Sequence, residues 1–374
     1  MDDGKRISDA LLDWFDRNQR PLPWRRNYQP YHIWISEIMG QQTQMDRVVD
    51  YFQKWCARFP DPVSIVQASQ EEIYKLWEGL GYYSRARNIQ RTAEILCRSY
   101  DCSVPDRYEV LLSLPGIGPY TAAAIMSLAF NRAYPVIDAN VERVFARLFD
   151  IPSPVKEPAN RLFIEKKACS LMPSGQARSF NQALMELGAL VCLPKRPRCG
   201  QCPINSYCEA LQQETVDQRP VSNRPVKSVA IVMATGLLLH DGKIFIQKRL
   251  ADDVWANLWE FPGGRLQKGE TASEAVRREY REETGFEIEI VEDLGLVRHS
   301  YTIYKVTLNC YLCRLLSRDT APPILTAAQE YRWVTWQELV EYAFPAGHRK
   351  LIANLAGRID KKNFFNPTAI NIDL

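Results

Sequence analysis

Four cysteines lie close together in the chain and could share one metal centre. Cys192, Cys199, Cys202 and Cys208 follow the spacing C-x6-C-x2-C-x5-C. A structural zinc usually takes two close pairs of ligands, and only Cys199 and Cys202 form such a pair. A cubane iron–sulfur cluster takes four thiolates at unequal spacings and therefore fits the pattern better. Four unrelated buried thiols are the poorer explanation, because free cysteine is scarce and seldom clusters.

A second group of reactive side chains is a set of carboxylates near residue 280. Glu279, Glu282 and Glu283 share one face of an expected helix through i, i+3 and i+4 spacing. Carboxylate oxygens are the ligands that hard divalent cations prefer, so these three could gather Mg²⁺ or a similar ion. Without a cation or solvent between them, the charges would repel one another.

The segment Leu114–Ala122, with the sequence Leu-Pro-Gly-Ile-Gly-Pro-Tyr-Thr-Ala, has the form of a hairpin between two helices. Gly116 and Gly118 let the backbone turn tightly and approach another backbone closely, and the following helix would offer unpaired N–H groups. Such a hairpin can grip DNA phosphate without reading the base sequence. An ordinary turn between two helices is the alternative interpretation.

Two patterns along the chain indicate which elements hold these residues. From about residue 7 to 208, apolar residues recur every three or four positions, which predicts a mainly α-helical region over 1–210. After a polar linker at 211–228, short β-rich runs surround one helix expected at Thr271–Glu283, so 229–374 should form a separate α/β domain. Cys310 and Cys313 fall in one of these strands, and their side chains should face opposite sides.

Composition limits the classes of function. The 374 residues suggest two or three domains, and a net charge of only +3 means that nucleic-acid binding must come from local patches. The polar start and the absence of a long apolar run predict a cytoplasmic protein without a secretory signal or a membrane span. In that reducing compartment the ten cysteines are expected to be thiols or metal ligands rather than disulfides.

Residues 1–210 resemble the MutY-type adenine DNA glycosylases of the endonuclease III superfamily. The matching stretches, besides the cysteine spacing and the hairpin, are Leu22–Arg25, Trp34–Met39, Gln41–Gln44, Gly79–Arg87 and Val136–Val141. The resemblance implies a six-helix barrel at about 28–135 with a helix-hairpin-helix, and a 4Fe-4S cluster loop at 192–208. It also implies a monomer that acts on double-stranded DNA with adenine opposite 8-oxoguanine or guanine.

Hydrolysis of an adenine N-glycosidic bond needs an acid for the leaving base and an anion for the oxocarbenium-like sugar. The resemblance assigns the acid, which later activates water, to Glu37 and the anion to Asp138. Burial of Glu37 among its apolar neighbours would raise its pKa, as a proton donor at neutral pH requires. Without the surrounding motifs, Glu37 could be a solvated helix residue and Asp138 a helix cap.

Tyr120 stands where bifunctional relatives place a lysine that forms a Schiff base, a chemistry that tyrosine cannot perform. The resemblance therefore implies a monofunctional glycosylase with Tyr120 in its active site.

The same resemblance implies how DNA is held while the target base is flipped out. In that family, wedge residues fill the gap that the flipped base leaves in the duplex, and they match Gln41, Gln42 and Tyr82 here. The residues that line the adenine pocket match Trp24, Arg25 and Glu186. One departure is Gly40, where the family usually has a larger apolar residue. Inside the cysteine loop we expect contacts to DNA phosphate from Lys195, Arg196 and Arg198.

Residues 264–286 resemble the Nudix box G-x5-E-x7-R-E-U-x-E-E-x-G-U at every fixed position, with Tyr280 at an apolar one. MutY-type proteins carry a Nudix-like domain that recognises the 8-oxoguanine opposite adenine, commonly with a degraded box. The intact box leaves three interpretations: a fold used only for lesion recognition, a recognition module that binds a cation, or a working pyrophosphohydrolase for oxidised nucleotides. Recognition is favoured, because a fold alone does not confer an activity.

The lesion-reading loop of that family, typically Phe-Ser-His, aligns with Tyr301, Thr302 and Ile303. Thr302 keeps a hydroxyl that can bond to the lesion, whereas Ile303 lacks the imidazole. A non-enzymatic alternative for the whole chain is an iron–sulfur DNA-binding or redox-sensing protein, in which Glu37 and Asp138 would be incidental.

Overall fold

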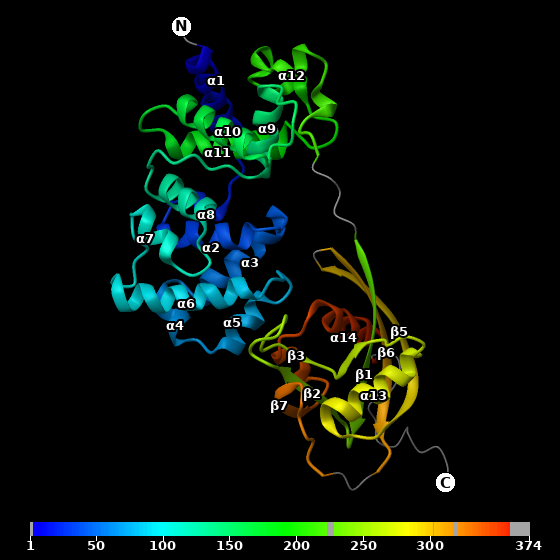
Figure 1. Cartoon of the computed structure of the whole chain (residues 1–374). Coiled ribbons are helices and arrows are strands. Elements are labelled where there is room, and N and C mark those ends of the chain that lie inside the picture. Colours follow the sequence, from blue (N-terminus) through cyan, green and yellow to red (C-terminus); the bar gives the residue numbers. More distant parts are fainter. Residues whose placement is uncertain (1–2, 223–227, 302, 318–320, 360–374) are drawn as a thin grey trace. The chain divides into compact units, whose positions relative to one another are not determined.

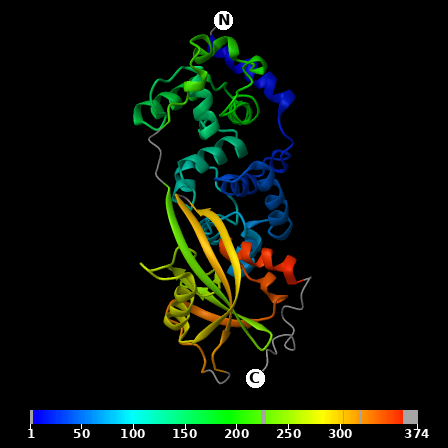
Figure 2. The same ribbon diagram turned by 90° about the vertical axis from the view of Figure 1, so that its right-hand side faces the viewer.

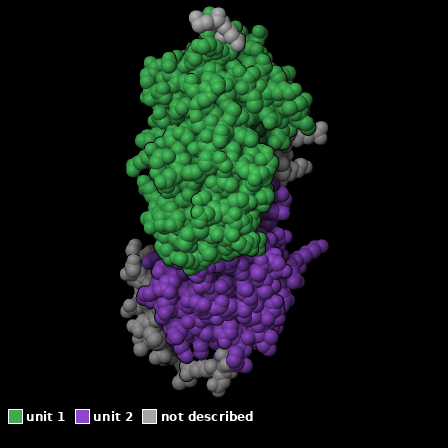
Figure 3. All heavy atoms as spheres, turned by 90° about the vertical axis from the view of Figure 1, so that its left-hand side faces the viewer, with its two compact units in different colours: residues 1–68, 84–225 green, residues 69–83, 226–374 purple. Residues whose placement is uncertain are grey.

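The structure is a computed structural model of the chain, and it describes residues 3–222, 228–301, 303–317 and 321–359. The chain divides into two compact units, residues 1–68 with 84–225 and residues 69–83 with 226–374 (Figure 3). The second unit contains the segment predicted as a separate α/β domain. It also contains residues 69–83, which the apolar periodicity assigned to the helical region.

The first unit is built from helices and short turns (Figure 1). Its helices are α1 (Asp3–Asn18), α2 (Pro30–Gly40), α3 (Met45–Arg58), α4 (Pro62–Gln67), α6 (Ser84–Ser99), α7 (Tyr108–Ser113), α8 (Pro119–Ala124), α9 (Ala139–Leu148), α10 (Pro158–Leu171), α11 (Ala177–Leu190) and α12 (Glu209–Gln212). Short 3-10 turns occur at Pro23–Arg25, Cys199–Gln201, Asn205–Tyr207 and Val216–Gln218, and α8 continues into a π-helical turn at Ile125–Ala129.

Helix α2 is buried on almost all sides, because apolar residues surround its axis. Pro30 begins the helix, where the fixed φ of proline suits the first turn. At the other end, Arg85 of α6 donates from Nη1 to the carbonyl oxygens of Ile38 and Gln41, both at 2.8 Å. The guanidinium thus satisfies acceptors that a helix end leaves open. A polar side chain on α2, such as that of Glu37, is therefore held inside the unit.

A second core in this unit joins α1, α9, α10 and α11. It includes Leu11, Phe145, Ile164 and Leu184, all nearly or fully buried. Three of the quartet cysteines, Cys192, Cys202 and Cys208, pack against the same core. The cysteine loop is therefore anchored to packed helices instead of lying loose on the surface.

The second unit contains helix α5 (Gln70–Trp77) and the C-terminal domain. The strands are β1 (Val229–His240), β2 (Lys243–Arg249), β3 (Trp259–Glu260), β4 (Gly263–Arg265), β5 (Ile288–Tyr301), β6 (Tyr304–Leu315) and β7 (Ala328–Val334). They run in the order β3-β2-β1-β6-β5, with β4 paired to β1 and β7 to β2. Strands β1 and β6 are parallel, whereas β5 and β6 form an antiparallel pair. A hairpin turn at Asp241-Gly242 joins β1 to β2, with His240 opposite Lys243.

Two helices cover opposite faces of this sheet, α13 (Ala272–Thr284) and α14 (Ala346–Ile359), as Figures 1 and 2 show. Val276 and Tyr280 of α13 lie in the core on one face, and Leu351 and Leu355 of α14 lie in the core on the other. Cys310 belongs to the α14 side and Cys313 to the α13 side, which confirms that the two thiols face apart.

Two cysteines outside the quartet, Cys97 and Cys102, form a disulfide at the end of α6, although thiols were expected. Asp101 and Cys102 adopt left-handed backbone conformations that reverse the chain and bring the two sulfur atoms together. The expectation that all cysteines remain thiols or metal ligands was therefore wrong for this pair. In the part of the chain that the structure describes, every helix is too short or too polar to cross a lipid bilayer.

Candidate functional site

The first unit contains a cavity of about 610 Å³. Its walls come from the turn at Pro23–Arg25, from α2 and the loop after it, from α8, from the start of α9 and from α11. The lining includes Trp24, Arg25, Glu37, Gly40, Gln41, Gln42, Tyr120 and Asp138 among the residues singled out from the sequence. Segments far apart in the chain thus meet around one space that is large enough for a nucleobase and its sugar.

Glu37 and Tyr120 meet on the wall of this cavity. The Tyr120 hydroxyl donates to Glu37 Oε2 at 2.9 Å. Burial raises the pKa of Glu37 to about 7, although the Tyr120 hydrogen bond pulls it down. Burial also raises the pKa of Tyr120 well above its ordinary value, so the phenol remains a donor. Glu37 can therefore exist as an acid at neutral pH.

Asp138 lines the same cavity and begins α9. Its Oδ1 accepts from the backbone N–H of Val141, and its Oδ2 accepts from Asn140 Nδ2, both at 2.8 Å. Burial raises the pKa of Asp138, while these two hydrogen bonds oppose the rise. The helix-cap role and the cavity position are therefore compatible, because the cap fixes the carboxylate at the cavity wall.

Behind the wall, Glu186 forms a buried ion-pair cluster. Its side chain is 1% exposed and accepts from Arg20 Nε at 2.7 Å and from Arg25 Nη2 at 2.9 Å. The two arginines line the cavity, but Glu186 does not. Its pKa is lowered although burial alone would raise it, because both guanidinium groups donate to the carboxylate. The structure thus places Glu186 as a support for Arg20 and Arg25, whereas the resemblance placed it on the pocket wall.

The residues expected to act as wedges lie in two places. Gln41 and Gln42 follow α2 and line the cavity, with Gln41 Nε2 at 3.4 Å from Thr121 Oγ1 and Gln42 in a left-handed conformation. Tyr82 belongs to the second unit and is also left-handed, with φ of 47°.

The hairpin of Gly116 and Gly118 connects α7 to α8, and both glycines are exposed. Gly116 has φ of 76°, and a Cβ added there would lie 2.8 Å from Asn88 Cβ. Only glycine therefore fits this turn, which brings backbone to the surface immediately before Tyr120.

The four quartet cysteines line one small cavity, of about 30 Å³, together with Arg147 and Ile204. Burial raises the pKa of Cys202 to about 12 and also raises the pKa of Cys199 and Cys208. The thiols would ionise only with a cationic partner. No three described His, Cys, Asp or Glu side chains converge tightly enough for a single metal ion. Four thiols around a shared space suit a larger cluster, so the donor set fits 4Fe-4S.

A chain of hydrogen bonds leads from Asp138 to the cysteine loop. Asn140 donates to Asp138, and Arg143 Nη2 donates to Asn140 Oδ1 at 2.8 Å. The Nε of Arg143 donates to the carbonyl oxygen of Cys192 at 2.7 Å. One turn further along α9, Arg147 donates from Nη1 to Cys192 Sγ at 3.4 Å. The cavity wall and the cysteine loop are therefore parts of one polar network.

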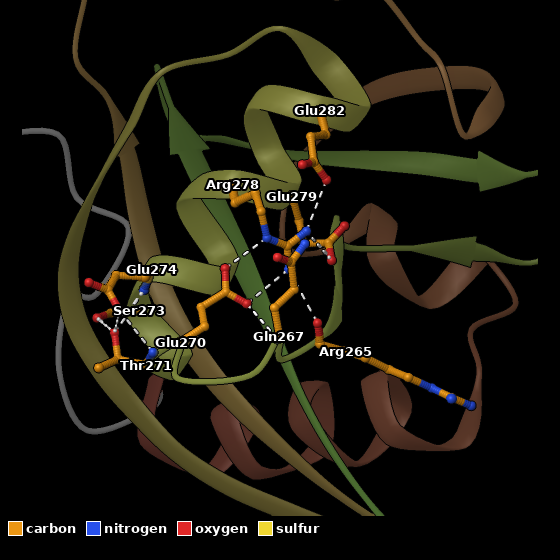
Figure 4. Close-up of polar contacts among 9 residues, drawn as sticks. All are labelled: Arg265, Gln267, Glu270, Thr271, Ser273, Glu274, Arg278, Glu279 and Glu282. Carbon is orange, nitrogen blue, oxygen red and sulfur yellow. Dashed lines mark hydrogen bonds and ion pairs between the residues drawn. The ribbon is translucent and has the colours of Figure 1, made fainter.

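In the C-terminal domain, Arg278 stands among the carboxylates of the Nudix-like box (Figure 4). Its guanidinium donates to Glu270 at 2.7 Å and to Glu279 and Glu282 at 2.9 Å each. These contacts raise the pKa of Arg278 beyond its already high value. An internal cation thus already separates charges that were expected to gather Mg²⁺.

The third expected ligand, Glu283, is separate from this group. It accepts from Gln247 Nε2 at 2.9 Å and from the backbone N–H of Gly263 at 3.3 Å. Burial, with the nearby Glu260 adding to it, raises the pKa of Glu283 to about 8. Burial therefore disfavours the carboxylate form of Glu283 that a metal ligand requires.

The lesion-reading loop is described only in part. Tyr301 ends β5, and Thr302 lies outside the described residues. The carbonyl of Ile303 accepts from the backbone N–H of Val229 at 2.9 Å, and its side chain is 38% exposed. The basic residues of the cysteine loop, Lys195, Arg196 and Arg198, are all exposed.

Several residues of the site were missed at the sequence level. Arg20 and Asn140 could have been found from the sequence, because they lie close along the chain to Trp24 and Asp138. Arg278 is a fixed position of the box itself. Lys156 and Arg161 also line the large cavity, but no local pattern marks them.

Three family models match the chain. Residues 35–168 match the HhH-GPD superfamily base excision DNA repair protein. Residues 192–208 match the iron-sulfur binding domain of endonuclease III, and residues 234–354 match the NUDIX domain.

Proteins named adenine DNA glycosylase are similar over nearly the whole chain. The one from Buchnera aphidicola subsp. Acyrthosiphon pisum (strain APS) is 31% identical over 367 residues, covering 96% of this chain and 99% of its own. The one from Mus musculus is 32% identical over 395 residues, covering 91% and 76%. The solved structure of a thermostable thymine-DNA glycosylase is 30% identical, with a TM-score of 0.52, and covers 56% of this chain and 98% of that chain.

Proposed function

The chain belongs to the adenine DNA glycosylases, hydrolytic enzymes of base-excision repair, and we propose that it excises adenine paired with 8-oxoguanine or guanine. The observation that carries the proposal is the hydrogen-bonded pair of Glu37 and Tyr120 on the same cavity wall as Asp138. We further propose that the protein acts as a monomer on duplex DNA.

Glu37 supplies the proton that makes adenine a leaving group. With a pKa of about 7, its carboxyl is close to half protonated at neutral pH, which suits a group that must give a proton and later accept one from water. The Tyr120 hydroxyl holds the carboxyl in one orientation toward the cavity. After the base has left, the carboxylate can take the proton of the attacking water.

Asp138 supports the positive charge that develops on the sugar. Its two hydrogen bonds, from Val141 and Asn140, fix both oxygens before the substrate arrives. A preoriented anion in a site screened from water stabilises an oxocarbenium ion more than a mobile one does. The same carboxylate is placed to trap the sugar as a covalent intermediate that water then opens.

The chain carries a 4Fe-4S cluster, and we propose Cys192, Cys199, Cys202 and Cys208 as its ligands. When bound, the cluster ties the cysteine loop into one rigid body. The exposed Lys195, Arg196 and Arg198 can then meet DNA phosphate from a fixed backbone, together with the hairpin at Gly116 and Gly118. Gln41, Gln42 and Tyr82 fill the space that the flipped adenosine leaves, while Trp24 and Arg25 line its pocket.

We assign the C-terminal domain to recognition of the base opposite adenine, with Tyr301 and Thr302 at the lesion. Arg278 pairs with Glu270, Glu279 and Glu282, but it is a fixed position of the box and does not separate the two functions. We favour recognition over phosphate chemistry because a fold alone does not confer an activity. We therefore expect no magnesium-dependent hydrolysis of oxidised deoxynucleoside triphosphates by the full chain. Turnover there would establish the box as a second active site.

The test is a single-turnover glycosylase assay on duplexes with adenine opposite 8-oxoguanine, guanine or cytosine. We expect release of free adenine from the first two and little from the third. Glu37→Gln and Asp138→Asn should lose at least about 100-fold in rate while they still bind the duplex, since removal of a general acid or an electrostatic stabiliser costs this much. Full activity of Glu37→Gln would refute the assignment.

The same assay tests whether the enzyme is monofunctional. Tyr120 cannot form a Schiff base, so borohydride should trap no covalent protein–DNA adduct during turnover. Strand cleavage should appear only after alkali or heat treatment of the abasic product.

A further inference from the structure

The segment that contains Tyr82 is attached to the C-terminal domain. Residues 69–83 fall within the matched base-excision repair region 35–168, yet they belong to the same compact unit as residues 226–374. Helix α5 begins after Ser69, whose hydroxyl accepts from the Glu72 N–H at 3.2 Å. The chain then turns at Glu78–Tyr83 before α6 starts at Ser84.

Glu78, the residue after α5, is the centre of this attachment. Its Oε1 accepts from the backbone N–H of Phe344 at 3.0 Å, and its Oε2 accepts from Arg349 Nη2. Lys75 Nζ donates to the same carboxylate at 2.8 Å and to the carbonyl oxygen of Tyr342 at 3.2 Å. The Glu78 side chain is only 12% exposed, so these donors meet it largely out of solvent.

A weaker attachment lies at the start of α5. Glu71 pairs with Lys248 of β2 at 2.9 Å, and both side chains are partly exposed. A cavity of about 170 Å³ lies beside it, lined by Tyr74, Trp259 and Arg332. Charged contacts therefore join both ends of α5 to the C-terminal domain.

The turn between Glu78 and Tyr83 has a defined shape. Gly79, Gly81 and Tyr82 have φ of 101°, 71° and 47°, so the turn needs three left-handed residues within four positions. Trp77 Nε1 donates to the carbonyl oxygen of Gly81 at 3.0 Å, and the Tyr74 and Tyr83 rings meet edge to face at 5.4 Å. Tyr82 is thus presented by a turn whose first residue is Glu78.

We propose that Glu78 is a positioning residue for base flipping: by tying α5 to the Tyr342–Arg349 segment, it lets the C-terminal domain hold Tyr82 in the conformation that enters DNA. This inference rests on the proposed function, in which Tyr82 is a wedge. It gives the C-terminal domain a second task besides reading the opposite base. It also predicts that a contact outside the lining of the large cavity changes the rate of base release.

The physical reason is the cost of leaving a partly buried set of charges incomplete. Without the Glu78 carboxylate, Lys75, Arg349 and the Phe344 N–H lose a common acceptor. The turn would then sample other conformations, since left-handed tyrosine is unfavourable by itself. Tyr82 would be correctly placed for only a fraction of the time.

The decisive experiment is a double-mutant cycle in the full-length enzyme with its cluster. Glu78→Gln keeps the size of the side chain and removes its charge. We expect about a tenfold lower single-turnover excision rate on the adenine·8-oxoguanine duplex, in the range known for coupling through a supporting residue. A duplex with 2-aminopurine at the target position should show weaker fluorescence with this variant, because the base is flipped out less often.

The other two proteins of the cycle are Tyr82→Ala and the double variant Tyr82→Ala with Glu78→Gln, and the excision rate is measured for both. If Glu78 acts through Tyr82, the double variant should be as slow as Tyr82→Ala alone. If Glu78→Gln slows excision by the same factor in both backgrounds, the inference is overturned, because Glu78 then acts independently of the wedge.

Two further variants guard against a simple loss of folding. Arg349→Gln removes the partner from the C-terminal side and should reproduce the Glu78→Gln rate and fluorescence. Glu94→Gln, at an exposed position of α6, is the matched control and should behave as the unmodified enzyme. A wild-type rate for Arg349→Gln together with a slow, thermally destabilised Glu78→Gln would assign Glu78 to stability alone and contradict the inference.

The outcomes also separate this inference from the proposed function. If the unmodified enzyme releases no adenine, the proposed function itself fails. If it releases adenine and Tyr82→Ala is equally fast, only the wedge role of Tyr82 fails, and the role of Glu78 fails with it.

Discussion

Tyr120 and Glu37 lie 83 positions apart in the sequence, and their side chains meet in one hydrogen bond of 2.9 Å. At the scale of residues, burial and this bond together set the acidity of the carboxyl that we propose as the catalytic acid. Burial pushes the pKa of Glu37 up, and the phenol pulls it down by stabilising the carboxylate. The balance leaves the pKa at about 7, where one group can serve as both acid and base.

The pH profile of excision follows from this balance. The acid form of Glu37 is the major form below a pH of about 7, so the single-turnover rate should fall as pH rises through that value. In Tyr120→Phe the donor is lost, the pKa of Glu37 rises further, and the falling limb should move to higher pH. Rates measured across the neutral range in both proteins test this. A limb that does not move would mean that another group controls the profile.

At the scale of elements, α9 connects Asp138 to the cysteine loop. Its first turn is capped by Asp138, and Arg143 on the next turn joins Asn140 to the carbonyl oxygen of Cys192. The guanidinium has a fork geometry that reaches both acceptors at once, which an ammonium group cannot copy. The helix thus links the cysteine loop to Asp138 through hydrogen bonds.

Replacement of Arg143 should therefore affect two properties together. We expect Arg143→Gln to lower the excision rate by about tenfold or more and to lower the iron content of the purified protein, with Arg143→Lys intermediate, because buried guanidinium contacts to loop carbonyls are lost. Iron analysis and single-turnover rates provide the measurements. Arg132→Gln is the control, since that side chain is 61% exposed. Full iron content together with a slow excision rate would show that the cysteine loop and Asp138 are not coupled.

Helix α13 provides the second prediction at this scale. Arg278 lies among Glu270, Glu279 and Glu282, so Arg278→Gln should leave these carboxylates to repel one another and lower the thermal unfolding midpoint. Mg²⁺ should then restore part of the loss in the variant and have little effect on the original protein. Calorimetry with and without Mg²⁺ tests the point. Equal stabilisation of both proteins by Mg²⁺ would show that the ion binds elsewhere.

The sequence made part of this site predictable. Glu37, Asp138 and the cysteine quartet belong to local motifs, and the capping of α9 by Asp138 is a short-range pattern. The pairing of Arg20 with Glu186 spans 166 positions, and the pairing of Glu78 with Arg349 spans 271. Such pairs depend on how helices pack, which local periodicity does not encode. The box pattern likewise included Arg278 but not its role as a counter-ion.

At the scale of the whole molecule, the charge distribution matters more than the net charge. The excess is only +3, but Lys195, Arg196 and Arg198 are exposed on one short loop. A loop held by packed cysteines can present these cations together to a phosphate backbone. The non-specific affinity for DNA should therefore depend on this loop and on the salt concentration.

Salt titration tests the loop directly. The logarithm of the DNA association constant falls with the logarithm of salt concentration by about 0.9 for each phosphate contact. Lys195→Gln with Arg198→Gln should therefore flatten the slope by up to about 2 and weaken matched and mismatched duplexes alike. Lys5→Gln on α1, 66% exposed, is the control. An unchanged slope would show that the cysteine loop does not contact DNA phosphate.

The Tyr120–Glu37 hydrogen bond also bears on how such enzymes can diverge. A lysine at position 120 would place an ammonium beside Glu37, which lowers the pKa of the carboxyl and removes the proton that adenine needs. An assay of Tyr120→Lys on the adenine duplex should therefore find slower base release than in the unmodified enzyme. A lysine at this position would therefore supply an amine but weaken the proton donor, so a change from hydrolytic to lyase chemistry calls for further substitutions around Glu37.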